Sequence, residues 1–213
     1  MTPRVVSINV GAVREVIFRG EIRTTGIWKD PVTGPVAVRT NGVEGDTQAD
    51  PTVHGGPSKA VYAYSAEDNS WWEQQLGTPV PPGTLGENLT ISGVDLNQSV
   101  IGEQWRVGGA VLQVTQARFP CWKLGLRMGD EGFPRRFLAA RRPGSYFSVV
   151  HEGDVEAGDS LEQIARPAHP VTVGLIARFN HADRELALRL LEATESNPEA
   201  GELKRLLTEA GVA

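Results

Sequence analysis

The sequence contains a single cysteine, Cys121, and this scarcity excludes several classes of protein. An internal disulfide framework needs at least two cysteines, and an iron–sulfur cluster held by one chain needs about four ligands. A zinc site is also disfavoured, because the four histidines show no ligand spacing with the one cysteine. Any chemistry of Cys121 therefore depends on residues of other types around it.

The sequence also lacks long apolar runs and recognisable cofactor motifs. No apolar run is long enough to cross a bilayer, and the N-terminus has no basic region followed by an apolar stretch. We therefore expect a cytoplasmic protein without membrane contact. No flavin or nicotinamide motif is present, so a redox enzyme of this sequence would need an external electron donor.

Composition and charge define the class of partner. A chain of 213 residues that is 40% hydrophobic and 22% charged is ordinary for a soluble globular protein. The net charge of -5 argues against a nucleic-acid binder. Residues 118–142, however, carry seven lysines or arginines and two carboxylates. Such a basic segment indicates an anionic ligand or, alternatively, a solvated basic helix.

Short strands separated by glycine, proline and aspartate dominate the first three quarters of the chain, which favours a barrel or a sandwich. Helices are predicted from Ala66 to Leu76, after a capping box, and from Pro134 to about Arg142. Trp71 and Trp72 are interpreted as packing residues. The polar, glycine-containing stretch after Lys123 is assigned no helix or strand. Strands are predicted over residues 4–10, 13–18, 22–27, 36–39, 60–64, 105–107, 110–115 and 144–150, near residue 91, and between 155 and 164.

The composition changes after Pro167 and Pro170, which mark a linker. Leucines then recur at helical spacing, which predicts three short helices in residues 168–213. Three short helices could form a DNA-binding unit. The tail from His169 onward, however, carries five basic and seven acidic side chains, and this net negative charge disfavours binding to DNA phosphates. We interpret it as a packing or dimerising extension, which would allow a homodimer.

The most informative stretch is Arg118-Phe119-Pro120-Cys121-Trp122-Lys123, in which cations flank the cysteine. Nearby positive charge favours the thiolate, the form that attacks or binds metal. Pro120 stiffens the backbone and biases Phe119 toward an extended conformation, so we expect Cys121 at the end of a strand. A lone cysteine is commonly a small buried hydrophobe, but such positions rarely have cations on both sides.

Three further segments carry candidate site residues. His54 and Lys59 bracket a Gly-Gly turn, Glu87 and Asn88 enter a predicted strand, and Arg141 and Arg142 end a predicted helix. Each pair also has a structural interpretation as loop or turn chemistry. If the segments converge, Cys121 is either a metal or sulfur ligand among cations that hold an anionic cofactor, or a nucleophile activated by His54 and oriented by Glu87 or Asn88.

Four ordered motifs resemble the MOSC domain, the C-terminal domain of molybdenum cofactor sulfurases, and most closely its small stand-alone bacterial YiiM-like branch. They are Asp46-Thr47-Gln48-Ala49-Asp50 with His54-Gly55-Gly56, Lys59-Ala60-Val61-Tyr62, Gly86-Glu87-Asn88-Leu89, and Pro120-Cys121-Trp122-Lys123-Leu124. The resemblance covers about residues 26–164. It implies a mainly β, MOSC-type β-barrel with a few short helices over residues 1–167, followed by the three-helix extension at 168–213.

The resemblance also implies a function. Cys121 would be the protein's sulfur ligand to the molybdenum of the molybdenum cofactor. His54, Lys59, Asn88, Arg118 and Lys123, and less directly Arg141, would contact the pterin and its phosphate. Relatives in this branch are linked to reduction of N-hydroxylated compounds, notably purine bases. A non-enzymatic cofactor or sulfur carrier stays open as an alternative, as does the nucleophile. Flavin, haem, iron–sulfur and pyridoxal phosphate groups are not expected on this chain.

Overall fold

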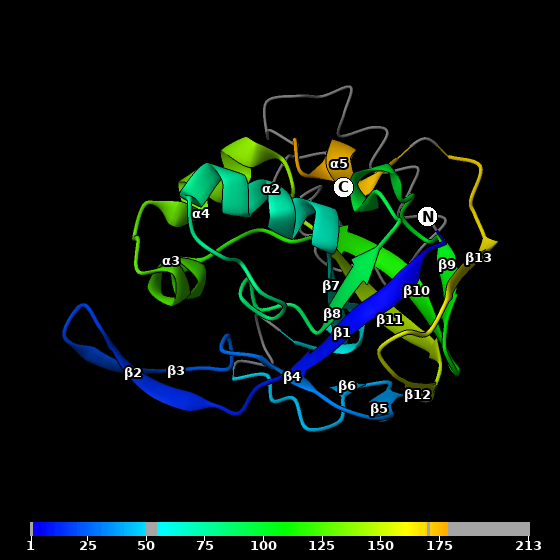
Figure 1. Cartoon of the computed structure of the whole chain (residues 1–213), viewed down its shortest axis with the longest axis horizontal. Helices are drawn as coiled ribbons and strands as arrows, with labels where there is room; N and C mark the ends of the chain where they lie inside the picture. Colours follow the sequence, from blue (N-terminus) through cyan, green and yellow to red (C-terminus); the bar gives the residue numbers. More distant parts are fainter. Residues whose placement is uncertain (1, 50–54, 170, 179–213) are drawn as a thin grey trace, which may run out of the picture.

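The molecule is described by a computed structural model that covers residues 2–49, 55–169 and 171–178. Its centre is one large sheet built from eight strands: β1 (Arg4–Val10), β4 (Asp30–Val32), β7 (Val61–Ser65), β8 (Leu89–Ser92), β9 (Gln104–Val107), β10 (Ala110–Ala117), β11 (Ser145–His151) and β13 (Leu161–Ala165). Their order is β13-β9-β10-β11-β7-β8-β1-β4 (Figure 1). All neighbours are antiparallel except β7 and β8, which are parallel and joined through helix α2 (Ala66–Leu76).

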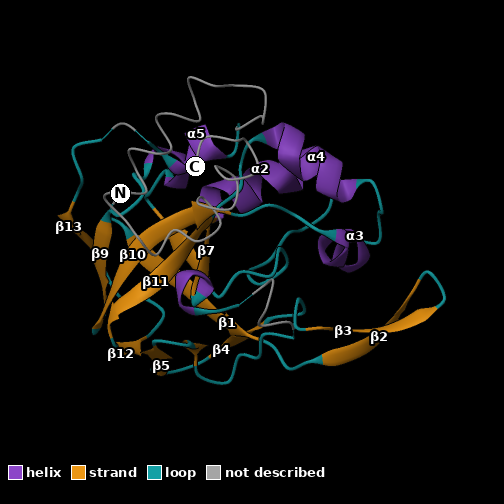
Figure 2. Cartoon of the chain, turned by 180° about the vertical axis from the view of Figure 1, so that it is seen from behind, coloured by secondary structure: helices purple, strands orange, loops and turns teal. Residues whose placement is uncertain are grey.

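Smaller elements surround this sheet. A three-stranded sheet is made of β5 (Val36–Arg39), β6 (Gly42–Val43) and β12 (Gly153–Val155), and a separate hairpin of β2 (Arg14–Phe18) and β3 (Glu21–Thr25). The remaining elements are α3 (Trp122–Met128), α4 (Phe133–Ala140), α5 (Val173–Ile176) and the 3-10 turns η1 (Pro57–Lys59) and η2 (Leu96–Gln98). The hairpin extends away from the main sheet on the side of α3 (Figures 1 and 2).

The expected closed barrel is not found. In the described residues, the outer strands β13 and β4 do not pair with each other, and the sheet therefore has two edges. The backbone near one edge meets the other edge at one end: Arg4 of β1 forms an isolated bridge with Ser160, and the Leu161 amide donates to the Pro3 carbonyl at 3.0 Å. The mainly β class is confirmed, and the architecture is a large mixed sheet.

Several predicted elements agree with the structure because their sequence signals, strand alternation and helix capping, involve only residues close together in the chain. The strands over 4–10 and 36–39 and the helix over 66–76 have the expected bounds. The Ser65 hydroxyl accepts from the Asp68 amide at 3.0 Å, and Gly77 ends α2 in the left-handed conformation. Helix α3 was not expected from its sequence, since it contains Gly125. A Cβ there would lie 3.0 Å from the Asp130 carbonyl, so glycine permits close packing against the following loop.

Two hydrophobic clusters lie on opposite faces of the strands. One is mostly aliphatic, with Ile8, Leu89, Leu112 and Val114 among its buried members. The other is aromatic and packs α2, α3 and α4 against β7. It is made of Ile27, Tyr62, Tyr64, Trp72, Val80, Leu85, Leu124, Phe133 and Phe137. Trp72 is buried and donates to the Tyr64 hydroxyl at 2.9 Å, which confirms its packing role.

The chain from 168 onward is described only to residue 178. Within it, Thr172 caps α5 by accepting from the Leu175 amide at 3.2 Å, and Val173 and Ile176 are buried. The rest of the predicted three-helix extension, from 179 to 213, lies outside the described residues.

Two glycines offer a matched test of packing beside the aromatic cluster. Gly144 and Gly129 both have positive φ, +66° and +65°. A Cβ on Gly144 would lie 2.6 Å from the Ala63 carbonyl oxygen and 2.7 Å from the Tyr64 ring, whereas one on Gly129 meets nothing within 4 Å. We expect Gly129→Ala to cost about 1–2 kcal/mol of unfolding free energy, from φ alone. Gly144→Ala should cost a further ~1–3 kcal/mol for the clash. Equal losses in urea unfolding would contradict this packing.

Candidate functional site

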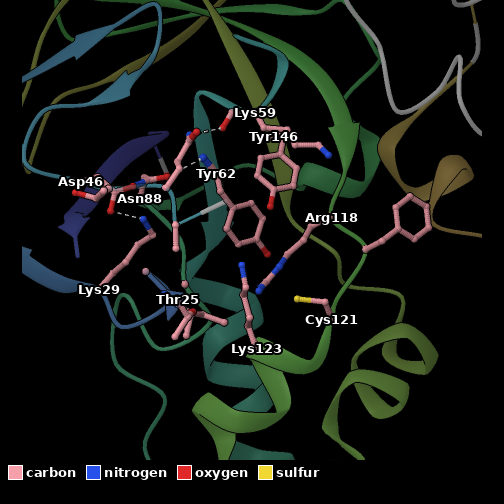
Figure 3. A pocket seen from close by; sticks show the side chains of 17 residues that line it. Thr25, Lys29, Asp46, Lys59, Tyr62, Asn88, Arg118, Cys121, Lys123 and Tyr146 are labelled. Atoms are coloured by element: carbon pink, nitrogen blue, oxygen red, sulfur yellow. Dashed lines mark hydrogen bonds and ion pairs between the residues drawn. The ribbon is translucent and has the colours of Figure 1, made fainter. Parts of the chain in front are cut away.

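A pocket opens where the hairpin base, the connection after β6, the sheet and the β10–α3 connection meet (Figure 3). Its empty volume, open mouth included, is about 640 Å³. The lining residues are Thr25, Gly26, Ile27, Lys29, Asp46, Thr47, Gln48, Ala49, Lys59, Tyr62, Gly86, Asn88, Arg118, Phe119, Cys121, Lys123 and Tyr146.

Cys121 reaches this pocket from the end of β10. Arg118, Phe119 and Pro120 connect the strand to α3, and Cys121 is the N-cap residue of that helix, with extended backbone angles of φ -126° and ψ -176°. Its side chain makes no capping hydrogen bond and is half-buried. In Figure 3 the sulfur points toward the guanidinium of Arg118. The cysteine is therefore a pocket residue and not a core residue, and it begins α3 four residues after the last residue of β10.

Arg118 is the most buried charge of the pocket, with 7% of its surface exposed. Its Nη1 donates to the Leu85 carbonyl at 2.5 Å, and its guanidinium lies 4.9 Å from the Tyr62 ring centroid and 5.5 Å from that of Phe137. The ion pairs formed within the described ranges include no carboxylate partner for it. Burial lowers the pKa of Arg118, but Tyr62, Tyr146 and Cys121 raise it and prevail. A buried cation without a carboxylate is costly unless an anion compensates it.

Two tyrosines form one wall of the pocket. Tyr146 of β11 lies directly opposite Tyr62 of β7, and their ring centroids are 5.1 Å apart. The Tyr62 hydroxyl donates to the Pro143 carbonyl at 2.8 Å, and burial raises the pKa of this phenol far above its ordinary value. The Tyr62 ring is thus uncharged and held in place, and the Arg118 guanidinium packs against it.

The opposite wall holds a buried ion pair between Lys29 and Asp46. The two oxygens of Asp46 also accept from the Gly11 amide and from the Asn88 side chain, both at 2.9 Å. Asn88 in turn accepts from the Tyr62 amide at 3.1 Å. Burial lowers the pKa of Lys29, an effect that Asp46 opposes. This network ties the Asp46 segment to β7, so Asn88 holds the pocket wall in addition to lining it.

Glu87 has a structural role. Its carboxylate accepts from the Gly83 and Leu85 amides at 2.8 and 3.1 Å and from the Thr90 hydroxyl at 3.0 Å. It is fully buried, burial raises its pKa, and it does not line the pocket. It holds the loop whose Leu85 carbonyl accepts from Arg118.

The structure brings together five of the residues that the sequence singles out: Lys59, Asn88, Arg118, Cys121 and Lys123 all line one pocket. His54 lies outside the described residues. Arg141 lies elsewhere, in a surface pocket beside Arg142, whose guanidinium pairs with Asp68.

Sequence reasoning missed Lys29 and Tyr146 as pocket residues. Lys29 follows a predicted strand without any motif around it, and Tyr146 looks like one more alternating strand residue. Only the pairing of β11 with β7 and the fold of the β3–β4 connection bring them to the site.

The fold and the site define a mainly β protein with one sulfur at the mouth of a cation-lined pocket. A family model described as the MOSC domain matches residues 50–162. The chain is 37% identical over 179 residues to the uncharacterized protein YflK of Bacillus subtilis, covering 84% of this chain and 81% of that protein. It is 30% identical over 191 residues to a reductase of Gibberella moniliformis, covering 87% of this chain but 33% of that protein.

The crystal structure of YiiM from Geobacillus stearothermophilus matches with a TM-score of 0.81 and 27% identity, covering 99% of this chain and 100% of that one. This chain belongs to the MOSC domain family, and the end-to-end match with YiiM fits its stand-alone YiiM-like branch. Among the described residues, no helix is long and apolar enough to span a membrane.

The Lys29–Asp46 pair generates a prediction with a pH signature. Asp46→Asn leaves a buried ammonium without its anion, so we expect a loss of about 3–5 kcal/mol at neutral pH. The pKa of Lys29 then falls further below its ordinary value of 10.5. At pH values between the lowered pKa of Lys29 in the folded variant and its ordinary pKa in the unfolded chain, the folded variant binds fewer protons than the unfolded chain. The stability of the variant therefore rises as pH increases through this range.

Urea unfolding measured from neutral pH to about pH 10 checks this expectation. The control is the double variant Lys29→Met/Asp46→Asn, which has no buried ammonium. It should recover most of the loss, and its stability should not show the rise with pH. If both variants respond to pH alike, the pair does not have the role described.

Proposed function

We propose that this protein binds the molybdenum cofactor in the Cys121 pocket and acts as an oxidoreductase on N-hydroxylated compounds, such as N-hydroxylated purine bases. Membership of the MOSC domain family supports cofactor binding, and the relative named as a reductase supports the reaction class. The observation that carries the proposal is the buried Arg118 guanidinium, which has no carboxylate partner in the described chain and lies beside the one thiol.

The pocket residues fit this cofactor chemically. A cysteine sulfur is a soft ligand of the kind that thiophilic metals select. Arg118, Lys123 and Lys59 supply positive charge on the same pocket, and guanidinium and ammonium groups are the usual protein partners of phosphate. Cys121 would hold the metal, Arg118 and Lys123 would offset the negative charge of the sulfur and the phosphate, and Lys59 would contact the pterin side. Asn88 would act by fixing the wall through Asp46.

Conversion of an N-hydroxyl group to N–H and water consumes two electrons and two protons, and the cofactor supplies that two-electron chemistry when bound. The chain's own residues bind and orient. Arg118 is locked against Tyr62 and Leu85, so its charge cannot move away from the sulfur. The Tyr62–Tyr146 wall excludes water from one side of the site. The electrons would come from an external donor protein, because the sequence has no flavin or nicotinamide motif.

Two other functions use the same residues. A carrier that holds the cofactor or a sulfur atom for another protein would need the same pocket but would not turn over substrate. A cysteine-nucleophile hydrolase or transferase needs an orienting group next to the thiol. Glu87 is committed to the Gly83–Leu85 loop and Asn88 to Asp46 and Tyr62, which disfavours the nucleophile.

The experiment is expression in a host that makes the cofactor, followed by metal analysis. We expect molybdenum in the parent protein and its loss in Cys121→Ser. Arg118→Gln removes a charge-assisted contact worth about 1.5–3 kcal/mol and should weaken retention about ten- to a hundredfold. Arg141→Gln is the control, since Arg141 lies in a different pocket, and its metal content should match the parent's.

Turnover of a hydroxylaminopurine with a chemical reductant then separates enzyme from carrier. We expect product from the metal-loaded parent and none from Cys121→Ser. Metal without turnover would favour the carrier. Hydrolysis of esters or amides by metal-free protein would instead support the nucleophile.

A further inference from the structure

The β2–β3 hairpin pairs with no other strand in the described residues, and isolated two-stranded hairpins are at best marginally stable. One face of the hairpin carries Ile17 and Ile22, which lie opposite each other and are 76% and 72% exposed. That face contributes no packing against the body. The hairpin is therefore held at its two ends.

The tip of the hairpin is attached to the start of α3 by a stack of side chains. The rings of Phe18 and Trp122 are 4.5 Å apart and inclined by 25°. The guanidinium of Arg19 lies 5.3 Å from the Phe18 centroid, and the Lys123 amine lies 6.0 Å from that of Trp122. Arg19 also pairs with Glu131 at 3.2 Å, although both side chains are exposed and this pair contributes little. The stack thus ends between Cys121 and Lys123, which both line the pocket.

The turn at the tip of the hairpin, between Phe18 and Glu21, has positive backbone φ angles. Arg19 and Gly20 have φ of +53° and +82°, the two positive values of a tight hairpin turn. Positive φ is uncommon for a non-glycine residue and costs energy. Arg19 and Arg141 are the two non-glycine residues in the described chain with this conformation. The contact of Arg19 with the Phe18 ring offsets part of this cost.

The base of the hairpin is built into the opposite wall of the same pocket. Thr25 is fully buried, and Thr25, Gly26 and Ile27 line the pocket. A Cβ on Gly26 would lie 2.3 Å from the Thr47 carbonyl oxygen, so this backbone is pressed against the Asp46–Ala49 segment. The hairpin therefore connects the wall of the pocket to the turn that carries the thiol.

We propose that the β2–β3 hairpin is a strap across the pocket, and that Phe18 is a positioning residue that fixes the Cys121 sulfur through the Trp122 ring. Trp122 directly follows Cys121, so the stacked ring restrains the backbone that aims the sulfur at Arg118. This role gives the proposed cofactor ligand a fixed orientation, and it rests on contacts within the chain alone.

The test uses the metal-free full-length protein and the rate at which iodoacetamide alkylates Cys121. Because the chain has one cysteine, the labelling rate reports on that sulfur alone. We expect Phe18→Ala to raise the rate about three- to tenfold, the range set by loss of one stacked aromatic pair. Ile17→Ala is the matched control on the neighbouring position and opposite face, and it should leave the rate unchanged. Phe18→Tyr keeps the stack and should restore the parent rate.

Urea unfolding of each variant accompanies the labelling. A rise in labelling for Phe18→Ala that Phe18→Tyr reverses, with folding retained, supports the strap. Equal rates in Phe18→Ala and Ile17→Ala, or a rise that Phe18→Tyr does not reverse, overturn it. The assay contains no molybdenum and no substrate, so its failure is distinct from failure of the proposed function. If labelling follows the prediction while the metal-loaded protein shows no turnover, the positioning role of the hairpin is supported and the proposed enzymatic activity is contradicted.

Discussion

The feature on which the site depends is a buried guanidinium without a carboxylate partner in the described chain. Arg118 lies between the rings of Tyr62 and Phe137 and donates to the Leu85 carbonyl, yet its charge is not neutralised by any of these contacts. Such a group is costly to bury unless an anion compensates its charge. Under the proposed function, an anionic cofactor in the pocket would compensate this charge beside Cys121, three residues further along the chain.

The fold fixes the charge from several directions at once. β10 delivers Arg118 and the turn to Cys121, β7 and β11 supply the tyrosine wall, and the loop held by Glu87 presents the carbonyl that Arg118 contacts. The Lys29–Asp46–Asn88 network ties the facing wall to the Tyr62 amide. Strands and buried polar groups therefore hold the Arg118 side chain in position. The side chains that remain for ligand chemistry, Cys121 and Lys123, lie where α3 begins.

Local signals in the sequence predicted the local structure well. The alternation in Arg4–Val10 and the capping box at Ser65 each specify one element without reference to the rest of the chain. Lys59, Asn88, Cys121 and Lys123 were predicted because they lie in motifs of recognisable order, and Arg118 because it is a cation close to the single cysteine. Lys29 and Tyr146 were not, because their place in the pocket depends on non-local strand pairing. Helix α3 was missed because Gly125 is unfavourable for a helix alone and is explained only by its contact with Asp130. The prediction of a closed barrel was wrong because closure also depends on non-local pairing: short strands in the sequence do not determine whether the outer strands of the sheet meet.

Membership of the MOSC domain family and the geometry of the pocket support one account, in which an anion is held beside a sulfur by a charge that the protein itself does not neutralise. The most direct test is the stability of the metal-free protein in inorganic phosphate against chloride at equal ionic strength. An anion that binds the folded state alone raises the unfolding free energy by mass action. Phosphate should stabilise the parent, whereas Arg118→Met should fold with comparable stability and show no response. If phosphate has no effect on the parent, or stabilises both proteins equally, the pocket is not built around the charge of Arg118.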